Sequence, residues 1–419
     1  MFGGLPPVNN AEPSLLQRAR IFSRYGYAPE PKWSVLQLFA DDVFAEQKRE
    51  LAARPHAELL KLAHHVADAV FAETFADLQG QIAIPISGGR DSRMILAMAV
   101  EAGLGARVTT LTWGVEGGLD VVLGRKVARH FGVRHDVIDV LAQPIGFEQL
   151  RNAYLADGRW TDLVHAHFNR MWRQIAPGAT GIVGYLGGPP VGCHYTRGAE
   201  HLSFAEAVAA FEQVNRRFSG GAAMFGDVRD RLIGADRVSL PEQLDLVFRQ
   251  EGYLRRLVAS HAADVRTPFA HPTWLRFMYA MPPSLREDSR FFSSYLHHRF
   301  PRAMRIGVAK SYGASANAAI WQRKVARQFV KLANVSANLL RSRGFRTFDK
   351  YGDPRDLALL LEQADAPRAY QRLIDQRPQR PSISQAVAWR QRAMLIVNLA
   401  CAIAEHEEQD YVWRKGSAG

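Results

Sequence analysis

The chain has 419 residues, of which 47% are hydrophobic and 22% are charged, and these proportions are typical of a folded globular protein. No apolar run reaches the roughly 18 to 20 residues that a bilayer-spanning helix requires, so no such helix is expected. The net charge of +12 favours anionic ligands or surfaces as partners.

Two features of the sequence indicate a cytoplasmic location. The two cysteines, Cys193 and Cys401, are too few for a disulfide framework or a zinc site. The first residues lack the basic stretch and the apolar core of a signal peptide. We therefore expect a cytoplasmic protein.

The order of helix and strand patterns predicts the fold class. Residues 1–54 mix prolines with a polar helical run and are expected to form an arm or a cap, and apolar positions at helical spacing predict a helix over 56–77. Strand and helix patterns then alternate over 82–86, 93–103, 107–113, 120–131, 135–140, 164–174 and 180–186. This alternation predicts an α/β fold with a doubly wound parallel sheet, whose ligand lies at the carboxyl ends of the strands.

The later part of the chain reads as mostly helical. Helical patterns dominate residues 200–300 and again 314–410, with no internal repeat. We therefore expect one α/β domain over 55–300, followed by a largely helical, basic region over 301–419.

The most informative segment covers residues 82–92, with the sequence IAIPISGGRDS. An apolar strand leads there into a turn containing Gly88 and Gly89, and a helix follows; amides in such a turn can face a phosphate. Ser87 and Ser92 add hydroxyl groups, and Asp91 is placed to hold a magnesium ion on the phosphate oxygens. A plain strand-to-helix turn with a side-chain cap is the alternative.

Three blocks of sequence resemble a known family. SGGRDS resembles the pyrophosphate loop (PP-loop), SGGxDS, of the ATP pyrophosphatases. Residues 109–140 are similar to the second strand, loop and helix of the synthetase domain of asparagine synthetases. The sequences VRTPF and MPPSL, within 265–285, resemble that family's R-x-P-F and LPP-x-L motifs. The chain also resembles the divergent, stand-alone asparagine synthetase-like proteins that accompany surface-polysaccharide genes.

The resemblance implies a PP-loop fold, ATP and Mg²⁺ as cofactors, and a set of site residues. It implies that ATP and its pyrophosphate are bound by Ile86, Ser87, Gly88, Gly89, Arg90, Asp91, Ser92, Trp113, Gly114 and Gly184. Asp91 is the expected magnesium ligand and catalytic group, with Lys310 and Arg266 as further catalytic candidates.

Several of these residues have structural alternatives. Trp113 is equally compatible with packing against a helix. Asp120 is compatible both with facing the nucleotide or substrate and with capping a helix. His135 is more typical of a structural histidine, and Arg266 is also compatible with an ion pair that fixes its loop.

The sequence departs from the asparagine synthetase pattern in three places. No cysteine precedes Cys193, so no glutaminase nucleophile is expected, and the nitrogen would come from ammonia, a substrate amine or a separate glutaminase. Tyr185 stands where the family has a glutamate, and Gly188 or Pro189 where it has an aspartate. The family lysine is missing near Ser293 and Ser294, so we expect Lys310 or Arg290 to take its place.

Basic residues are concentrated between 299 and 350, where twelve Lys and Arg accompany a single acid. Arg323, Arg327 and Lys331 repeat along one helical face, and Trp321, Val325, Leu332 and Leu339 lie on another. The alternatives are a solvated surface, an anionic substrate such as an acidic glycan, an anionic membrane surface, or nucleic acid.

Three functions are compatible with these patterns. The first is an ATP-dependent, amide-forming ligase that adenylates a small-molecule or glycan carboxylate and passes it to ammonia or an amine. The second is a catalytically silent nucleotide-binding or scaffold subunit in surface-polysaccharide assembly. The third is a tRNA-modifying PP-loop enzyme, which the lack of cysteine pairs and of RNA-binding motifs disfavours.

Overall fold

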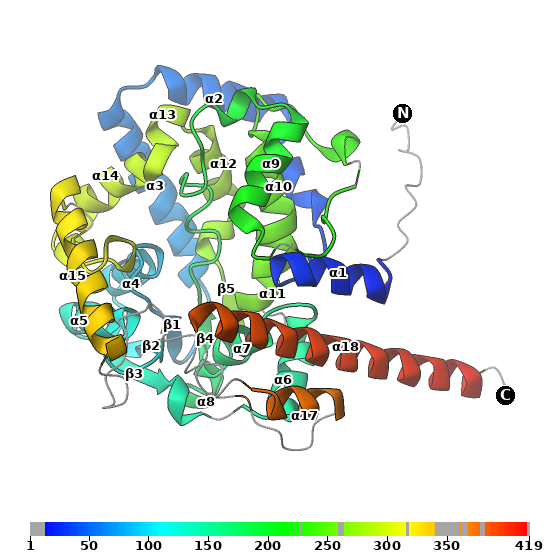
Figure 1. Ribbon diagram of the computed structural model, residues 1–419. Helices are drawn as coiled ribbons and strands as arrows, with labels where there is room; N and C mark the ends of the chain where they lie inside the picture. Colours follow the sequence, from blue (N-terminus) through cyan, green and yellow to red (C-terminus); the bar gives the residue numbers. More distant parts are fainter. Residues whose placement is uncertain are drawn as a thin grey trace.

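The structure is a computed structural model that describes residues 13–143, 145–218, 220–226, 228–258, 264–315, 318–339, 361, 368–377 and 382–416. Its centre is a sheet of five parallel strands in the order β3-β2-β1-β4-β5 (Figure 1). The strands are β1 (Ile82–Pro85), β2 (Val108–Gly114), β3 (Arg134–Asp139), β4 (Thr180–Ile182) and β5 (Val265–Arg266).

Helices surround the sheet (Figure 1). The N-terminal elements are α1 (Leu15–Tyr25), η1 (Trp33–Phe39), α2 (Asp42–Ala53) and α3 (His56–Phe75). Between the strands lie α4 (Asp91–Glu101), η2 (Gly105–Arg107), α5 (Leu119–Phe131), η3 (Val140–Ala142), α6 (Phe147–Ala153), η4 (Tyr154–Gly158), α7 (Leu163–Phe168), α8 (Trp172–Ile175), η5 (Ala199–His201), α9 (Phe204–Asn215), η6 (Arg229–Arg231), α10 (Leu240–Leu244), η7 (Asp245–Leu254) and α11 (Arg255–Val258). After β5 follow η8 (Pro268–Ala270), α12 (Pro272–Ala280), α13 (Pro283–Arg286), η9 (Glu287–Ser289), α14 (Arg290–Arg299), η10 (Ala303–Arg305), η11 (Ala309–Ser311), α15 (Ile320–Leu339), α17 (Arg368–Asp375) and α18 (Ile383–Gly416).

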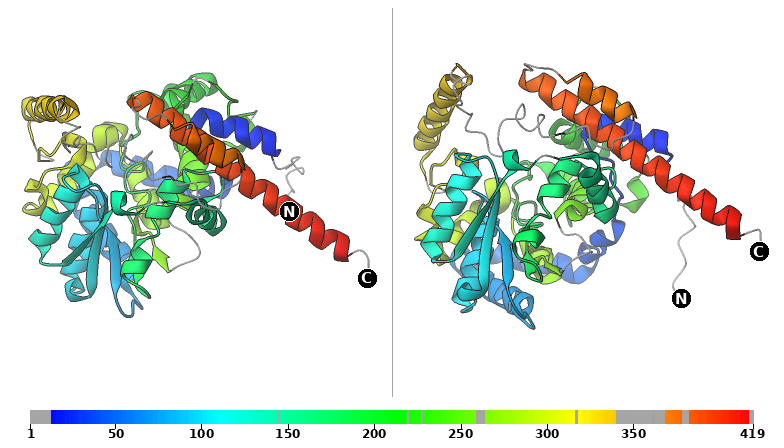
Figure 2. Two further views of the ribbon diagram at one scale, coloured as in Figure 1. Left: turned by 60° about the horizontal axis from the view of Figure 1, so that its bottom comes forward. Right: turned by 90° about the horizontal axis from the view of Figure 1, so that it is seen from below.

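Both faces of the sheet are covered, which is why its central strand is apolar throughout (Figure 2). Ile82, Ala83 and Ile84 are all fully buried. On one face, α4 packs on β1 and α5 packs on β2 and β3. On the other face, Ala83 contacts a small apolar cluster that includes Trp172 of α8. The sheet is therefore the middle layer of three, as expected for an α/β fold.

The strand order places a crevice at the centre of the sheet. From β1 the chain moves outward through β2 to β3, and it then returns to place β4 on the other side of β1. Loops that leave the carboxyl ends of β1 and β4 consequently diverge, and such a switch point is where doubly wound sheets bind ligands.

A single apolar core extends through the expected sequence regions. The main cluster of buried residues includes Phe22 of α1, Phe44 of α2, Ile84 of β1, Trp274 of α12 and Met394 of α18. α1 packs on α18 and α2 packs on α12. The expected arm, α/β domain and helical region therefore share one core.

The predicted parallel α/β sheet is confirmed, and the predicted helix over 56–77 is α3. Two details differ: the strand expected over 180–186 ends at Ile182, and the helix expected over 164–174 is divided into α7 and α8. None of the described helices has the length of apolar sequence that a bilayer span requires.

Candidate functional site

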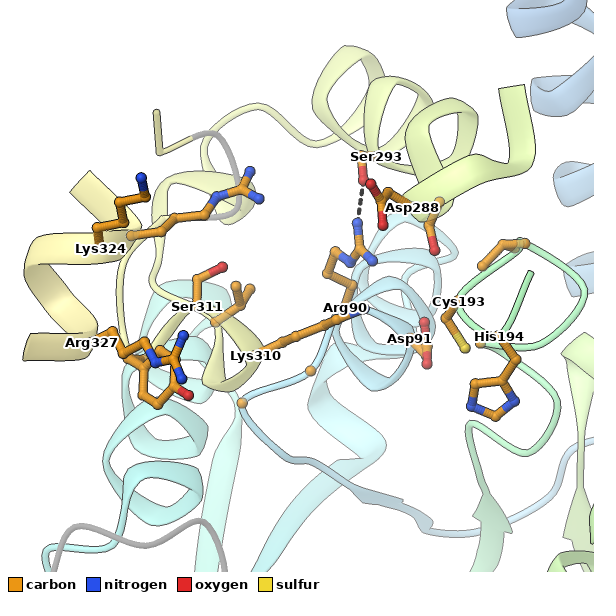
Figure 3. A pocket seen from close by; sticks show the side chains of 18 residues that line it. Arg90, Asp91, Cys193, His194, Asp288, Ser293, Lys310, Ser311, Lys324 and Arg327 are labelled. Atoms are coloured by element: carbon orange, nitrogen blue, oxygen red, sulfur yellow. Dashed lines mark hydrogen bonds between the residues drawn. The ribbon is translucent and has the colours of Figure 1, made fainter. Parts of the chain in front are cut away.

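A cavity of about 820 Å³ opens at the switch point (Figure 3). Five segments form its wall: the loop after β1, the loop after β4, the turn before α14, the turn around η11, and the first part of α15. The lining residues are Gly88, Gly89, Arg90, Asp91, Gly188, Val191, Cys193, His194, Asp288, Ser289, Ser293, Val308, Lys310, Ser311, Tyr312, Arg323, Lys324 and Arg327.

The loop after β1 is closed by its own hydrogen bonds. The Ser87 amide donates to Ser92 Oγ at 3.3 Å, and the Gly89 amide donates to Ser87 Oγ at 3.2 Å. The Gly88 amide donates to Oδ1 of buried Asp120, at 2.8 Å. These amides already donate to side chains within the protein. The structure therefore does not show the predicted turn in which the amides face a phosphate. What faces the cavity is the turn itself and the positive end of α4, which begins at Asp91.

Asp120 therefore has a role that neither alternative anticipated. The cap of α5 is Gly118, and the Asp120 carboxylate instead ties α5 to the glycine turn.

Asp91 is pressed against the loop after β4. A Cβ atom on Gly187 would lie 2.6 Å from Cβ of Asp91, and one on Gly184 would lie 3.4 Å from the same atom. Only glycine fits at residue 187, because real Cβ atoms do not approach other atoms so closely. Gly184 thus lies behind Asp91 and supports it, while Asp91 itself lines the cavity.

Lys310 is brought to the cavity by a direct contact between η11 and the glycine turn. The Ala309 amide donates to the Gly88 carbonyl at 2.8 Å. Arg93, fully buried in α4, fixes the preceding residues by donating to the carbonyls of Ala303, Ile306 and Gly307. Burial lowers the pKa of Arg93 to about 10, so it remains a cation at neutral pH.

The cavity is strongly basic. Its lining contains the cations Arg90, Lys310, Arg323, Lys324 and Arg327, against Asp91 and Asp288 as carboxylates. Lys324 and Arg327 face Arg90 and Asp91 across the opening (Figure 3). A polyanion is the ligand that such a wall attracts most strongly.

The basic stripe that the sequence predicts on α15 thus has its first two members, Arg323 and Arg327, in the cavity wall. Trp321, Val325 and Leu332, on the predicted apolar face, are 65%, 60% and 67% exposed. α15 therefore turns cations toward the cavity and leaves apolar side chains in solvent.

Arg90 reaches Ser293, near which the asparagine synthetase pattern has a lysine that this sequence lacks. Its guanidinium donates to Ser293 Oγ on α14 (Figure 3). The turn that precedes this helix contains two successive left-handed residues, Asp288 (φ 54°) and Ser289 (φ 57°), and such conformations cost about 1 to 3 kcal/mol each. The turn brings the Asp288 carboxylate and the fully buried Ser289 into the cavity wall.

The loop after β4 offers a thiol and an imidazole rather than carboxylates. Tyr185 is buried, and its hydroxyl donates to Glu251 at 2.9 Å, outside the cavity lining. Burial and that carboxylate raise the pKa of Tyr185 far above its usual range, so it stays neutral. Cys193 and His194, by contrast, both line the cavity.

His194 is bonded to a buried carboxylate. Its Nδ1 lies 3.1 Å from Oδ2 of Asp245, which is the first residue of η7. Burial alone would lower the pKa of His194, but the hydrogen bond to Asp245 and the neighbouring Cys193 raise it to about 9. Burial alone would raise the pKa of Asp245, but the contact with His194 lowers it. The pair is therefore an imidazolium and a carboxylate at neutral pH.

The first testable consequence concerns Gly88. A Cβ atom there would lie 2.6 Å from Leu123 Cδ1 and 2.8 Å from Ala309 Cβ, so Gly88→Ala must displace either α5 or η11. Overpacking of this kind typically lowers the free energy of unfolding by about 1 to 3 kcal/mol. Denaturant unfolding measures it, with Gly105→Ala as control, because a Cβ atom there lies 3.5 Å from its nearest neighbour. Equal stabilities of the two variants would contradict the close contact.

The second consequence concerns pH. Because the pKa of folded His194 is about 9, above the ordinary 6.5, its contribution to stability is complete below pH 6.5. The contribution is lost as pH rises through about 9. The loss of unfolding free energy in His194→Gln should therefore be large at pH 6 and small near pH 10. The control is His201→Gln, whose side chain is 84% exposed; a loss for His194→Gln that is independent of pH would contradict the ion pair.

Seven residues predicted for the site are absent from the cavity lining: Ile86, Ser87, Ser92, Trp113, Gly114, Gly184 and Arg266. The indole of Trp113 donates to Asn169 at 3.1 Å and stacks on Phe168 of α7, and Gly114 packs near Val121. The Arg266 guanidinium donates to the carbonyls of Thr74 and Ala76 at the end of α3. The structure corrects the expectation that Arg266 lines the cleft: its charge is used to hold α3 beside β5.

Other candidates are also structural. His135 contacts Thr110 at 3.0 Å, and burial lowers its pKa to about 4, so it is neutral. Arg290 pairs with Glu287 at 3.3 Å and is absent from the cavity lining, so Lys310 and Arg90 are the cations that reach it from this side. Ile86 is buried, and its carbonyl accepts a hydrogen bond from Thr112 at 2.6 Å.

Sequence reasoning missed Cys193, His194, Asp245 and Asp288. A Cys-His pair in a glycine- and proline-rich loop is a weak signal that was available. Nothing in the sequence linked that pair with Asp245, about fifty residues later, and the left-handed turn at Asp288 has no sequence signature.

Carboxylates that could help to hold a metal are few. Among the described residues no group of three or more His, Cys, Asp or Glu side chains is arranged to bind a metal ion. Asp91 and Asp288 line the cavity, and Mg²⁺ commonly takes only one or two carboxylates when phosphates supply further ligands.

In comparisons with known proteins, no family model matches the chain and no curated protein matches it.

Proposed function

We propose that the chain is an ATP-dependent ligase of the PP-loop type, related to asparagine synthetases, that adenylates a carboxylate and transfers it to ammonia or an amine. The observation that carries this proposal is the glycine turn at the switch point, which opens on one cavity lined by five cations. A triphosphate carries the negative charge that this arrangement attracts.

The residues present are suited to ATP with magnesium. Gly88 leaves no space for a side chain between the turn and its neighbours, and α4 directs its positive end at the cavity. Asp91 and Asp288 are the carboxylates on the cavity wall: Asp91 begins α4 directly after the glycine turn, and Asp288 lies in the turn before α14. Bound Mg²⁺ would supply charge neutralisation of the phosphate oxygens.

The cations take the part that a lysine plays in asparagine synthetases. When a carboxylate attacks the α-phosphate, negative charge develops on the departing pyrophosphate. Lys310 and Arg90 reach the cavity beside the turn, and Arg323, Lys324 and Arg327 reach it from α15. Fixed cations of this kind typically contribute about 10²- to 10³-fold in rate each. The product would be an acyl-adenylate, and an amine would then attack its carbonyl carbon to give an amide and AMP.

For the first turns of α15, an anionic substrate explains the basic residues better than a membrane surface or a nucleic acid does. Arg323, Lys324 and Arg327 lie in the wall of a concave site, which suits a small anion. A carboxylate substrate, free or on a glycan, also carries the charge that this wall attracts.

One observation favours a second candidate, the catalytically silent nucleotide-binding subunit. Tyr185, at the position of the family glutamate, turns to Glu251 and offers the cavity no carboxylate. A silent subunit would bind ATP and release no pyrophosphate with any carboxylate.

Calorimetric titration of the full chain with α,β-methylene ATP, with and without Mg²⁺, tests the proposal. We expect saturable binding at one site that is tighter with Mg²⁺. No binding in either condition would overturn the proposal. Binding followed by no pyrophosphate release from ATP, across a broad panel of carboxylates and amines, would favour the silent subunit.

A further inference from the structure

Besides its cations and carboxylates, the cavity wall contains a thiol and an imidazole, which an ATP site does not require. Cys193 and His194 lie on the wall opposite the α15 cations, and Asp91 lies between the two walls (Figure 3). The thiol of Cys193 is partly exposed, and the imidazole of the next residue, His194, lies on the same wall (Figure 3).

The carboxylate behind the imidazole is itself held in place. Asp245 is almost fully buried, and its Oδ2 accepts hydrogen bonds from His194, at 3.1 Å, and from Gln250, at 2.8 Å. Arg249 lies 3.6 Å from its Oδ1. A thiol, an imidazolium and a buried carboxylate in this order can activate a nucleophile: the imidazolium stabilises the thiolate, and the carboxylate fixes the ring and its charge.

The loop that carries the thiol is also rigidly anchored. A Cβ atom on Gly188 would lie 2.7 Å from Cys193 Sγ, and one on Gly192 would lie 2.0 Å from the Arg286 carbonyl. Arg286 Nε donates to the Pro190 carbonyl at 3.0 Å. The backbone that carries Cys193 is therefore held in place on the wall.

We propose that Cys193, His194 and Asp245 form an activated thiol that attacks an electrophilic carbonyl carbon presented in this cavity. Cys193 and His194 are the catalytic residues, and Asp245 is a positioning residue. The site is selective for activated acyl groups, because the cationic wall opposite it suits the phosphate of an acyl phosphate or acyl-adenylate.

The identity of the electrophile rests on the proposed function. Sγ forms a bond to the acyl carbon of the adenylate while the bond from that carbon to the AMP oxygen breaks, and AMP leaves with the electron pair. The thiol proton is held on His194. An amine then attacks the thioester, the C–S bond breaks and its electron pair leaves with sulfur as the thiolate, and the amine proton is released to solvent, so an amide is formed without any oxidant or reductant.

Alkylation of the full chain by iodoacetamide at pH 7, followed by mass spectrometry of the cysteine peptides, tests the thiol. An ordinary cysteine is only a few per cent thiolate at pH 7, so an imidazolium partner should accelerate Cys193 about tenfold over N-acetylcysteine. The chain supplies its own control: Cys401 is buried, burial raises its pKa to about 11, and it should stay unmodified while the protein is folded.

Two variants test whether His194 and Asp245 cause the expected reactivity of Cys193. His194→Gln should slow Cys193 alkylation about tenfold while Cys401 stays unmodified. Asp245→Asn should displace the pH–rate profile to higher pH, a change that a purely structural role would not produce. A Cys193 no faster than N-acetylcysteine, or equally fast with and without His194, would overturn the proposal; the first comparison needs no variant to fold.

One further experiment tests the activated thiol separately from the proposed nucleotide site. Mg²⁺ with α,β-methylene ATP should slow Cys193 alkylation at least tenfold, because the nucleotide would occupy the space in front of Sγ. Rapid alkylation that the analogue does not slow would keep the activated thiol. It would overturn the acyl-adenylate as its electrophile, and with it the proposed location of the nucleotide.

Discussion

Asp91→Asn is expected to weaken magnesium-dependent binding of α,β-methylene ATP by about 10- to 100-fold, because one ionic contact is worth about 1.5 to 3 kcal/mol. The substitution keeps the size of the side chain, which the close approach of Gly187 requires, and removes only its charge. Without Mg²⁺ the variant should bind no more weakly than the wild type, because a carboxylate beside phosphates is repulsive when no cation intervenes. Calorimetry of both proteins, with and without Mg²⁺, measures the difference.

Asp42→Asn is the matched control for that experiment. Asp42 is also the first residue of its helix, α2, and its side chain is fully exposed and far from the cavity lining. It should leave nucleotide binding unchanged. A loss of affinity in Asp91→Asn that is the same with and without Mg²⁺ would contradict a metal-holding role for Asp91.

Glu242→Gln is expected to lower the free energy of unfolding by about 3 to 5 kcal/mol, the usual cost of leaving a buried charge without its partner. Glu242 and Arg286 are each 5% exposed and form an ion pair. The Arg286 guanidinium also lies 4.7 Å from the Tyr279 ring centre and bonds to Pro190, in the loop that carries Cys193. The substitution should therefore destabilise the protein and loosen one wall of the cavity together.

Denaturant unfolding at pH 7 measures this effect, and Glu58→Gln is its control. Glu58 pairs with Arg54 at 3.4 Å, but both side chains are substantially exposed, and such pairs contribute about 0 to 1 kcal/mol. Similar losses in the two variants would show that the Arg286–Glu242 pair is not decisive for stability.

The parts of the fold that follow from local pattern were predictable. The apolar run of β1 and the helical spacing of Leu59, Val70 and Phe71 in α3 indicate burial directly, and both elements are confirmed. β4 was expected to be longer because Val183 and Leu186 are apolar, but their burial comes from the turns of a loop that packs on Asp91.

The candidate site was predictable only in part, and for a physical reason. Gly88, Gly89, Arg90 and Asp91 belong to one continuous segment, and the structure places all four on the cavity wall. Residues that meet through tertiary contacts have no such signal. Arg266 resembled a cleft residue by sequence but binds the end of α3.

In the proposed nucleotide site, groups from elsewhere in the chain would offset the loss of two expected acids and a lysine. Asp288 supplies a second carboxylate from the turn before α14, and Arg90 reaches Ser293 from the glycine turn itself. The cations of α15 add charge from a helix more than two hundred residues after β1. A site rebuilt from distant elements in this way is visible only once the chain is folded.

A crystal structure of the full chain with Mg²⁺ and α,β-methylene ATP, at concentrations well above the calorimetric dissociation constant, tests the nucleotide site most directly. We predict that the triphosphate lies over Gly88 and Gly89 with Mg²⁺ beside Asp91, and that Lys310 and Arg327 contact the phosphates. A triphosphate bound at another place, or a cavity that stays empty at saturating analogue, would contradict the proposed nucleotide site and the ligase function built on it.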